Sequence, residues 1–498
     1  MLSGVLLGAA FLPAPLGFLA WFGFIPLLEA LDDRCRGGAS GRSLYGLGMV
    51  FGLAFYLFGI YWIALLSDAA ITVPWLKYPG WIATGAYLAL FGGFATWLAG
   101  WLVKRSGAPL ALVFPFAYLA VEELRASGEL GFPWFQPGYT QHAYAPVIQM
   151  ASLGSVTLVT LWLLLLNVLT WRALRGTSRA RAALGAALTL LLPWAWGQRA
   201  LDAAPRADGP PVALVQGNIA GEIKWSGTHQ REILDTFMSL SERAVEDTSR
   251  PILIIWPETA TGSYLRKQFD QTLRVVGFAA RTGVPVFSGY ADYEVEPGGR
   301  VHYFNGAGPF QPDGATTPVY AKRHLVPFGE RMPFQWLAPA LARVDLGQAE
   351  WTPGRASVLF PSEAGPFSCL VCFESIFPDL ARGDVRAGAK WLVNVTNDEW
   401  FGLSAALYQH AAMSVFRAVE NRVPLARCAN TGLTLVADAN GRVVSTLPVF
   451  EPGVLVTELP CVATVGFPTP YTRFGDWPGL LSLLALAGLA LRAAVRSR

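Results

Sequence analysis

The sequence is poor in charged residues and in cysteine. Asp, Glu, Lys and Arg together make up 15% of its 498 residues, where a soluble domain has roughly 25%. The formal net charge of +3 provides no strong basic field, so nucleic acid is not an expected partner. The five cysteines are odd in number and irregularly spaced, which argues against a disulfide framework and leaves at least one free thiol.

Long apolar segments take the place of the missing charge. Residues 1–200 are almost continuously apolar, residues 210–470 have the composition of a soluble domain, and residues 477–493 are apolar again. A helix that crosses a bilayer needs about 20 mostly apolar residues. We predict seven spans before the central domain and one after it: Leu2–Ala20 with a proline break, Trp21–Leu31, Tyr45–Leu66, Gly80–Val103, Leu110–Val121, Val147–Trp171, Ala183–Trp196 and Trp477–Leu491.

The loops between these spans alternate in basic residues. One set of alternate loops is poor in basic residues and holds only Lys77 and Arg125 before the central domain. The rich set holds Arg34, Arg36, Arg42, Lys104, Arg105, Arg172, Arg175, Arg179, Arg181, Arg492, Arg496 and Arg498. By the positive-inside rule the rich set is cytoplasmic, which places the central domain outside and the C-terminus in the cytoplasm. Buried core helices of a large soluble protein would also be apolar, but their loops would not alternate in this way.

The central domain alternates short apolar runs with amphipathic segments. The runs typical of strands are Pro211–Gln216, Pro251–Trp256, Val284–Gly289, Lys390–Val395 and Arg427–Ala437. The segments typical of helices are Arg231–Val245, Tyr264–Arg281 and Ser404–Asn421. This alternation predicts a mixed α/β sheet core. The aromatic segment Met332–Leu346 fits either an interfacial arm or a surface loop.

Candidate polar residues stand at three places in this domain, at strand ends or in turns. Glu258 comes directly after Ile254-Ile255-Trp256-Pro257, and the proline stops the strand there. Lys322 and Glu330 lie in a loop rich in charge, Pro and Gly, and Cys372 ends the strand-like run Phe367–Val371. Each of these alone could be an ordinary loop residue.

Together these residue types supply the parts of a nucleophilic site. A thiolate nucleophile needs a base to take its proton and a positive group where an oxyanion develops. Cys369 and Cys372 lie three apart on a strand and therefore face opposite sides, so only one can reach the site. A redox Cys-x-x-Cys pair normally opens a helix, which disfavours that alternative here. Among the histidines, only His324 lies near Lys322 and is a candidate supporting residue.

Several motifs resemble one known family. They are Val215-Gln216-Gly217-Asn218-Ile219, Trp256-Pro257-Glu258-Thr259, His324-Leu325-Val326-Pro327-Phe328-Gly329-Glu330, Cys372-Phe373-Glu374 and Asn397-Asp398-Glu399-Trp400-Phe401-Gly402. The central domain resembles the nitrilase, or carbon–nitrogen hydrolase, superfamily with its Glu–Lys–Cys triad. The whole chain resembles the apolipoprotein N-acyltransferase family of the bacterial inner membrane. The resemblance implies a polytopic α-helical membrane domain joined to an extracytoplasmic αββα sandwich.

The resemblance also implies roles for individual residues. Glu258 would be the general base, Lys322 the oxyanion stabiliser and Cys372 the nucleophile. The supporting or substrate-binding residues would be Glu330, Trp225, Glu374 and Phe373. Phe373 departs from the tyrosine often found after the nucleophile, which puts any role of that hydroxyl in doubt.

The implied reaction moves an acyl chain from a phospholipid to the α-amino group of a diacylglyceryl apolipoprotein through a cysteine thioester. No metal or other cofactor is expected.

Two other functions stay open from the sequence. A membrane-anchored amidase or nitrilase would carry the same triad and differ in its acceptor. A non-catalytic scaffold or transporter would be expected to lack part of the triad, and a transporter would carry ionisable residues within its spans. The nearest such residues, Glu122 and Glu123, lie at the end of a span beside Arg125, where solvation or pairing explains them.

Overall fold

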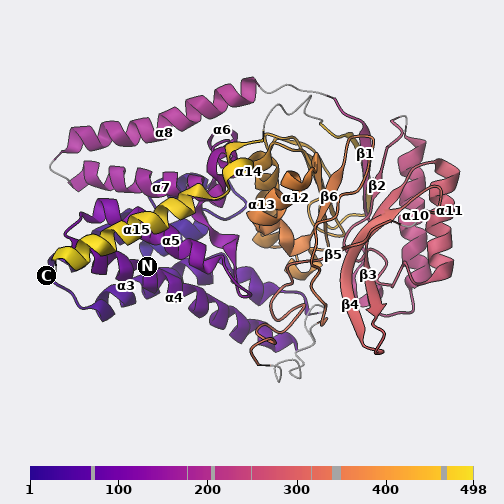
Figure 1. Ribbon diagram of the computed structural model, residues 1–498, viewed down its shortest axis with the longest axis horizontal. Helices are drawn as coiled ribbons and strands as arrows, with labels where there is room; N and C mark the ends of the chain where they lie inside the picture. Colours follow the sequence, from indigo (N-terminus) through magenta and orange to yellow (C-terminus); the bar gives the residue numbers. More distant parts are fainter. Residues whose placement is uncertain are drawn as a thin grey trace. The chain divides into compact units, whose positions relative to one another are not determined.

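The computed structural model describes residues 1–68, 73–175, 178–203, 208–247, 249–315, 317–338, 349–460 and 468–496 (Figure 1). Contacts between these residues divide the chain into two compact units. The first unit holds Met1–Leu65, Trp75–Ala204 and Thr469–Arg498. The second holds Pro205–Pro468 together with the short segment Leu66–Pro74.

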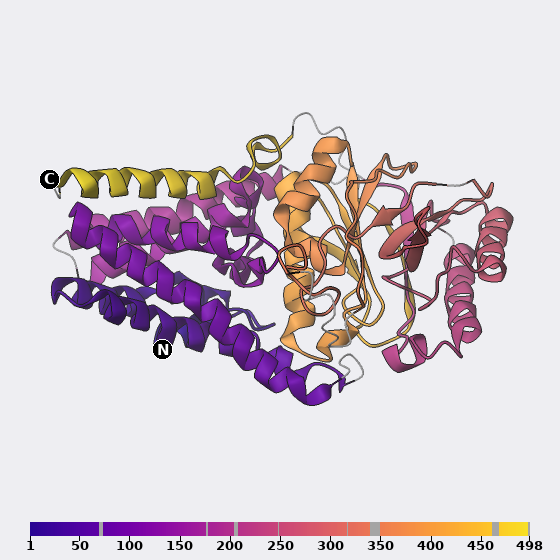
Figure 2. The ribbon, with the colours of Figure 1, turned by 60° about the horizontal axis from the view of Figure 1, so that its bottom comes forward.

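The first unit is helical. Its helices are α1 (Leu2–Ala9), α2 (Ile25–Arg36), α3 (Gly41–Gly59), α4 (Lys77–Ser106), α5 (Leu110–Arg125), α6 (Ala145–Ile148), α7 (Ala151–Arg175), α8 (Arg179–Asp202), α14 (Pro470–Phe474) and α15 (Trp477–Arg496). The C-terminal helix α15 contacts α4 and α5, so the end of the chain packs beside helices near its beginning (Figure 2). The unit is thus formed from both ends of the sequence.

Within the described residues, four helices are long and apolar enough to cross a membrane. They are Gly41–Gly59, Pro74–Ser106, Ala151–Arg175 and Trp477–Arg496. Each overlaps one of the eight predicted spans, and the other four predicted spans remain predictions. The first of those four is broken as its prolines suggested, because α1 ends at Ala9 and a 3₁₀ turn follows only at Gly17–Trp21.

Small residues bring α3 and α4 into close contact. A Cβ atom on Gly48 would lie 2.0 Å from the carbonyl oxygen of Gly92, and one on Gly52 would lie 2.8 Å from Cα of Ala89. Such close backbone approach is typical of helix pairs in membranes, where packing replaces the hydrophobic effect as the main attraction.

The second unit contains two mixed β-sheets. The first has the strand order β11-β1-β2-β3-β4-β5 and the second the order β10-β9-β8-β7-β6. The strands are β1 (Pro211–Gln216), β2 (Ile254–Ile255), β3 (Val286–Val295), β4 (Val301–Phe310), β5 (Tyr320–Ala321), β6 (Phe367–Val371), β7 (Trp391–Thr396), β8 (Leu425–Ala429), β9 (Leu435–Ala437), β10 (Val443–Thr446) and β11 (Gly453–Glu458). The strand pairs β1–β2, β2–β3, β6–β7 and β7–β8 are parallel.

The sheets pack face to face with helices outside both. One apolar cluster joins side chains of the two sheets, including Leu214, Phe287 and Val393. A second cluster covers the other face of the first sheet with α10 (Gln230–Glu246) and α11 (Phe269–Thr282). A third covers the second sheet with α12 (Pro378–Ala387) and α13 (Ala405–Asn421). Figure 1 shows the resulting four layers, helix–sheet–sheet–helix, which confirms the predicted α/β core.

One predicted strand of the second unit differs from the structure. The run Arg427–Ala437 is two strands, β8 and β9, because the chain turns back between them and pairs antiparallel. The segment Met332–Leu346, predicted as either an interfacial arm or a surface loop, falls partly outside the described residues. In its described part, Trp336 and Leu337 are exposed and lie in a turn, and both alternatives remain predictions.

Candidate active site

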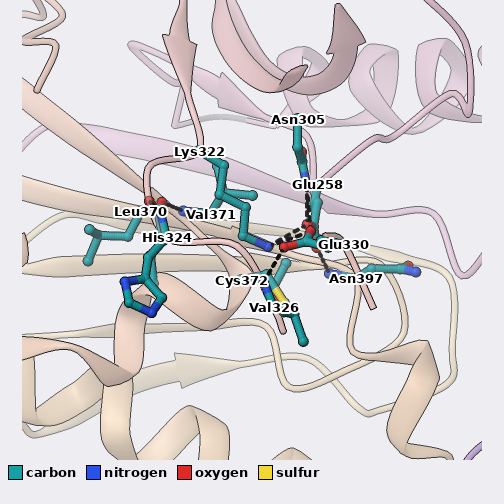
Figure 3. Close-up of polar contacts among 12 residues, drawn as sticks. Glu258, Asn305, Lys322, His324, Val326, Glu330, Leu370, Val371, Cys372 and Asn397 are labelled. Carbon is teal, nitrogen blue, oxygen red and sulfur yellow. Dashed lines mark hydrogen bonds and ion pairs between the residues drawn. The ribbon is translucent and has the colours of Figure 1, made fainter. Parts of the chain in front are cut away.

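Three strand ends bring Glu258, Lys322 and Cys372 together. Glu258 follows β2, Lys322 follows β5, and Cys372 follows β6, so base and cation come from the first sheet and the thiol from the second. Figure 3 shows these three side chains converging, with Glu330 beside them.

Glu258 is held by donors on both carboxylate oxygens. Its side chain is buried, Asn305 Nδ2 donates to Oε1 at 2.7 Å, and the backbone N–H of Asn397 donates to Oε2 at 3.0 Å. Lys322 Nζ lies 3.5 Å from Oε1. A buried carboxylate is costly unless it is paired, and here three donors fix its position.

Lys322 lies between two carboxylates. Its Nζ donates to Glu330 Oε1 at 2.8 Å, and Glu330 is itself fixed by the backbone N–H of Val326 at 2.8 Å. Burial opposes the charge of Lys322, but Glu330 and then Glu258 raise its pKa above the ordinary value. The ammonium therefore stays charged and can stabilise an oxyanion.

Cys372 occupies a strained turn between β6 and the 3₁₀ turn η8 (Cys372–Ile376). Its φ of 50° is in the left-handed region, which is uncommon for a residue with a side chain and is often found at functional sites. Burial raises the pKa of its thiol, and the charge of Glu258 raises it further, against the opposite effect of Lys322. The resting group is a thiol, so a nucleophilic role requires a base.

Glu374 ties the nucleophile strand to the lysine loop. It is fully buried and accepts hydrogen bonds from the backbone N–H of Val371 at 2.8 Å and of Arg323 at 2.7 Å. Tyr320 Oη donates to it at 2.7 Å and the His324 N–H at 3.1 Å. Burial raises the pKa of Glu374 although these donors oppose the rise. The contacts fix Cys372 relative to Lys322 without Glu374 reaching the reacting atoms.

Comparisons with known proteins match both units of the chain. Residues 3–169 match the model of the apolipoprotein N-acyltransferase N-terminal domain, and residues 211–466 match that of carbon–nitrogen hydrolases. An apolipoprotein N-acyltransferase of Geobacter metallireducens is 36% identical over 99% of this chain and 94% of its own length. One of Chlorobaculum tepidum is 32% identical over 100% of this chain and 96% of its own. The chain belongs to the apolipoprotein N-acyltransferase family.

Among solved structures, a nitrilase-superfamily protein of Saccharomyces cerevisiae matches 51% of this chain and 91% of its own length, with 20% identity and a TM-score of 0.38.

Trp225 and Phe373, two of the predicted supporting residues, differ in their exposure. Trp225 follows α9 (Gly221–Lys224) and is 52% exposed, so its indole is available to a substrate. Phe373 is buried, and its ring packs against Phe377 at 5.3 Å and His324 at 6.1 Å between centroids.

The ring of His324 packs against that of Phe377, with 3.8 Å between centroids and a tilt of 35°. Burial, together with the charge of Lys322, lowers the pKa of His324 to about 4. It is therefore neutral at pH 7.

The sequence analysis missed several residues that complete the site. Asn305 comes from the middle of β4, where nothing in the sequence marks it. Lys224 is fully buried, and its Nζ donates to the Glu258 carbonyl at 3.2 Å and lies 3.5 Å from Asn397 Oδ1. Burial lowers the pKa of Lys224 to about 8, against the charges of Glu258 and Glu399. Asn397 alone among them was marked in the sequence, because it begins one of the motifs that resemble the family.

One group of side chains beside the nucleophile has the composition of a metal site. Ligand atoms of Cys372, Asp398 and His410 all lie within 4.8 Å of one another. The Asp398 carboxylate, however, already accepts from Arg427 Nη2 at 2.5 Å and Thr396 Oγ1 at 2.8 Å. An arginine paired to a carboxylate competes with a cation for the same oxygens, so the arrangement fits a hydrogen-bond network better than a metal centre.

Proposed function

We propose that this apolipoprotein N-acyltransferase moves a fatty acyl chain from a phospholipid to the α-amino group of an N-terminal diacylglyceryl-cysteine. The observation that carries the proposal is the match to apolipoprotein N-acyltransferases across both units of the chain. Glu258 and Lys322 are buried 3.5 Å apart, and the partly buried Cys372 is close enough for both to affect its pKa, so the three supply the base, the cation and the thiol that acyl transfer by a nucleophile requires.

In the first half-reaction, Glu258 takes the proton of Cys372 and the thiolate attacks the ester carbonyl of the phospholipid. Lys322 stabilises the tetrahedral oxyanion. The oxyanion collapses, the ester C–O bond breaks, and Glu258 returns its proton to the departing alkoxide. The products are a lysophospholipid and a thioester on Cys372.

In the second half-reaction, the acceptor amine attacks the thioester. Glu258 removes the proton of the attacking amine, Lys322 again stabilises the oxyanion, and the C–S bond breaks. The proton then passes to the thiolate, which restores Cys372. Glu330 and Glu374 hold Lys322 and the nucleophile turn in place throughout.

The helical unit supports a reaction between two lipid-anchored substrates. In the described part of the chain four helices are long and apolar enough to span a bilayer, and the loop charges favour a central domain outside the cytoplasmic membrane with the C-terminus inside. We place the enzyme in the bacterial inner membrane with this orientation. A site tethered at the bilayer surface avoids the cost of extracting an acyl chain into water.

The proposal is tested by mass spectrometry of the protein after incubation with phospholipid alone. We expect an acyl adduct on Cys372 that hydroxylamine removes and that is absent from Cys372→Ser. The matched control is Cys369→Ser, because Cys369 is buried in the core between the sheets and should leave the adduct unchanged. A folded protein that forms no adduct would contradict acyl transfer, and small amides would then be the substrates to screen.

Trp225 is expected to contact the lipid. It is half exposed beside buried Lys224, whose Nζ lies 6.0 Å from the centre of its ring. Burying a large side chain against an acyl chain contributes about 1.5–3 kcal/mol, so Trp225→Ala should raise KM for phospholipid by about tenfold or more with little change in kcat. The control is Phe269→Ala, an exposed aromatic on α11. Unchanged KM in Trp225→Ala would show that this indole is not a lipid contact.

A further inference from the structure

A buried histidine lies directly behind the nucleophile, and the reaction described above does not use it. His410 comes from α13, is fully buried, and places Nε2 3.1 Å from the backbone carbonyl oxygen of Cys372. Its other ring nitrogen, Nδ1, lies 2.9 Å from Oδ1 of Asp398. The imidazole thus bridges the backbone of the nucleophile and a buried carboxylate.

Asp398 gives this imidazole a fixed support. It follows β7 and is fully buried, and Arg427 of β8 and Thr396 of β7 both donate to its carboxylate. Although burial opposes ionisation, Arg427 and His410 hold the pKa of Asp398 well below its usual range. A charged carboxylate with three fixed partners orients the ring that it contacts, as outer-shell carboxylates orient histidines elsewhere.

His410 contacts the backbone carbonyl oxygen of Cys372, a residue whose backbone conformation is strained. A residue with φ near 50° is strained by about 1–3 kcal/mol unless its surroundings determine the conformation. Ser375 Oγ donates to the same Cys372 carbonyl at 3.0 Å, and Ser375 Oγ and His410 Nε2 are 3.1 Å apart. A carbonyl only accepts hydrogen bonds, so the contact from His410 requires a proton on Nε2. Burial lowers the pKa of His410 and favours the neutral ring, whose Nδ1 then accepts from Arg427 Nη2 at 3.2 Å.

We propose that His410 is a positioning residue for the nucleophile. Its Nε2 holds the Cys372 carbonyl, and through it the left-handed turn that directs the thiol toward Glu258 and Lys322, while Asp398 and Arg427 hold the imidazole. The proposal deepens the acyltransferase function and depends on it for its kinetic readout.

Replacing His410 with glutamine or with asparagine tests its two ring contacts one at a time. Glutamine places a donor near the position of Nε2 and asparagine one near Nδ1, so His410→Gln keeps the contact to Cys372 and His410→Asn keeps the contact to Asp398. A misplacement of about 1 Å at a reacting group can cost about 10²-fold in rate. We therefore expect kcat for thioester formation to fall about 100-fold in His410→Ala and His410→Asn. It should recover to within about tenfold of wild type in His410→Gln, with KM unchanged throughout.

The experiment measures thioester formation with phospholipid, melting temperature and metal content in the full-length protein. The control is His229→Gln, because His229 is half exposed on another element. If the rate of thioester formation falls equally in all three His410 variants and the melting temperature falls with it, His410 only supports the fold and the proposal is overturned. A stoichiometric metal in wild type that is lost in His410→Ala would overturn it as well.

Alkylation of Cys372 by iodoacetamide separates this inference from the proposed function. If wild type forms no thioester, the acyltransferase proposal fails, yet alkylation still reports whether the thiol is presented to its base. We expect His410→Gln to react at close to the wild-type rate and His410→Ala to react more slowly. Equal alkylation rates in both variants and wild type would contradict positioning by His410.

Discussion

Glu258→Gln is expected to slow formation of the Cys372 thioester by about 10²–10⁴-fold, which is the contribution of a positioned general base. Glutamine keeps the shape of the side chain and an acceptor for Asn305, but its NH2 group replaces the oxygen that accepts from the Asn397 N–H, so a rate loss alone does not identify the missing base. The need for a base is large here because burial and the neighbouring carboxylate raise the pKa of the Cys372 thiol.

A pH profile distinguishes loss of the base from loss of structure. Without Glu258 the reaction depends on thiolate formed by exchange with solvent, and at any pH below the thiol pKa that fraction rises about tenfold per pH unit. The rate of Glu258→Gln should therefore climb steeply between pH 7 and 9 when measured by single-turnover mass spectrometry. Glu363→Gln, at an exposed position, is the control. A variant that retains more than a tenth of the wild-type rate at pH 7 would show that Glu258 is not the base.

Lys322→Met is expected to lose both activity and stability. Removal of one oxyanion donor costs about 10²–10³-fold in rate. The same change leaves buried Glu258 and partly buried Glu330 without their shared cation, and breaking a buried pair in this way costs about 3–5 kcal/mol. Kinetics and thermal unfolding of the purified protein measure the two effects.

A double variant separates the two effects of Lys322. Lys322→Met with Glu330→Gln removes one of the stranded charges, so we expect melting temperature to recover in part while the rate stays low. Lys390→Met, at an exposed lysine, should change neither quantity. Recovery of the rate together with stability would mean that Lys322 only supports the fold.

The sequence predicted those parts of the site that follow apolar runs. Glu258 and Cys372 stand directly after short buried strands, and such strands are recognisable because their residues are apolar on both faces. Phe367–Val371 ends where the sequence indicated, and Cys369 is fully buried in the core between the sheets, whereas Cys372 is only partly buried at its margin. The local pattern of apolar residues was sufficient to predict the positions of Glu258 and Cys372 at the ends of these strands.

Contacts between distant segments could not be predicted in the same way. His410 lies within an amphipathic helix, where a polar residue on the buried face looks like any core histidine until Cys372 and Asp398 are placed beside it. Asn305 lies in β4, which the sequence analysis did not identify, and it reaches Glu258 across 47 residues of chain. Such contacts depend on sheet order and register, which one sequence does not specify.

The origin of the site in two different sheets also affects how the protein matures. Glu258 and Lys322 belong to the first sheet and Cys372 to the second. A partly folded chain whose sheets have not yet joined holds a protonated thiol far from its base, and such a thiol is a poor nucleophile. The thiol therefore has its base and its cation beside it only after the core between the two sheets has closed.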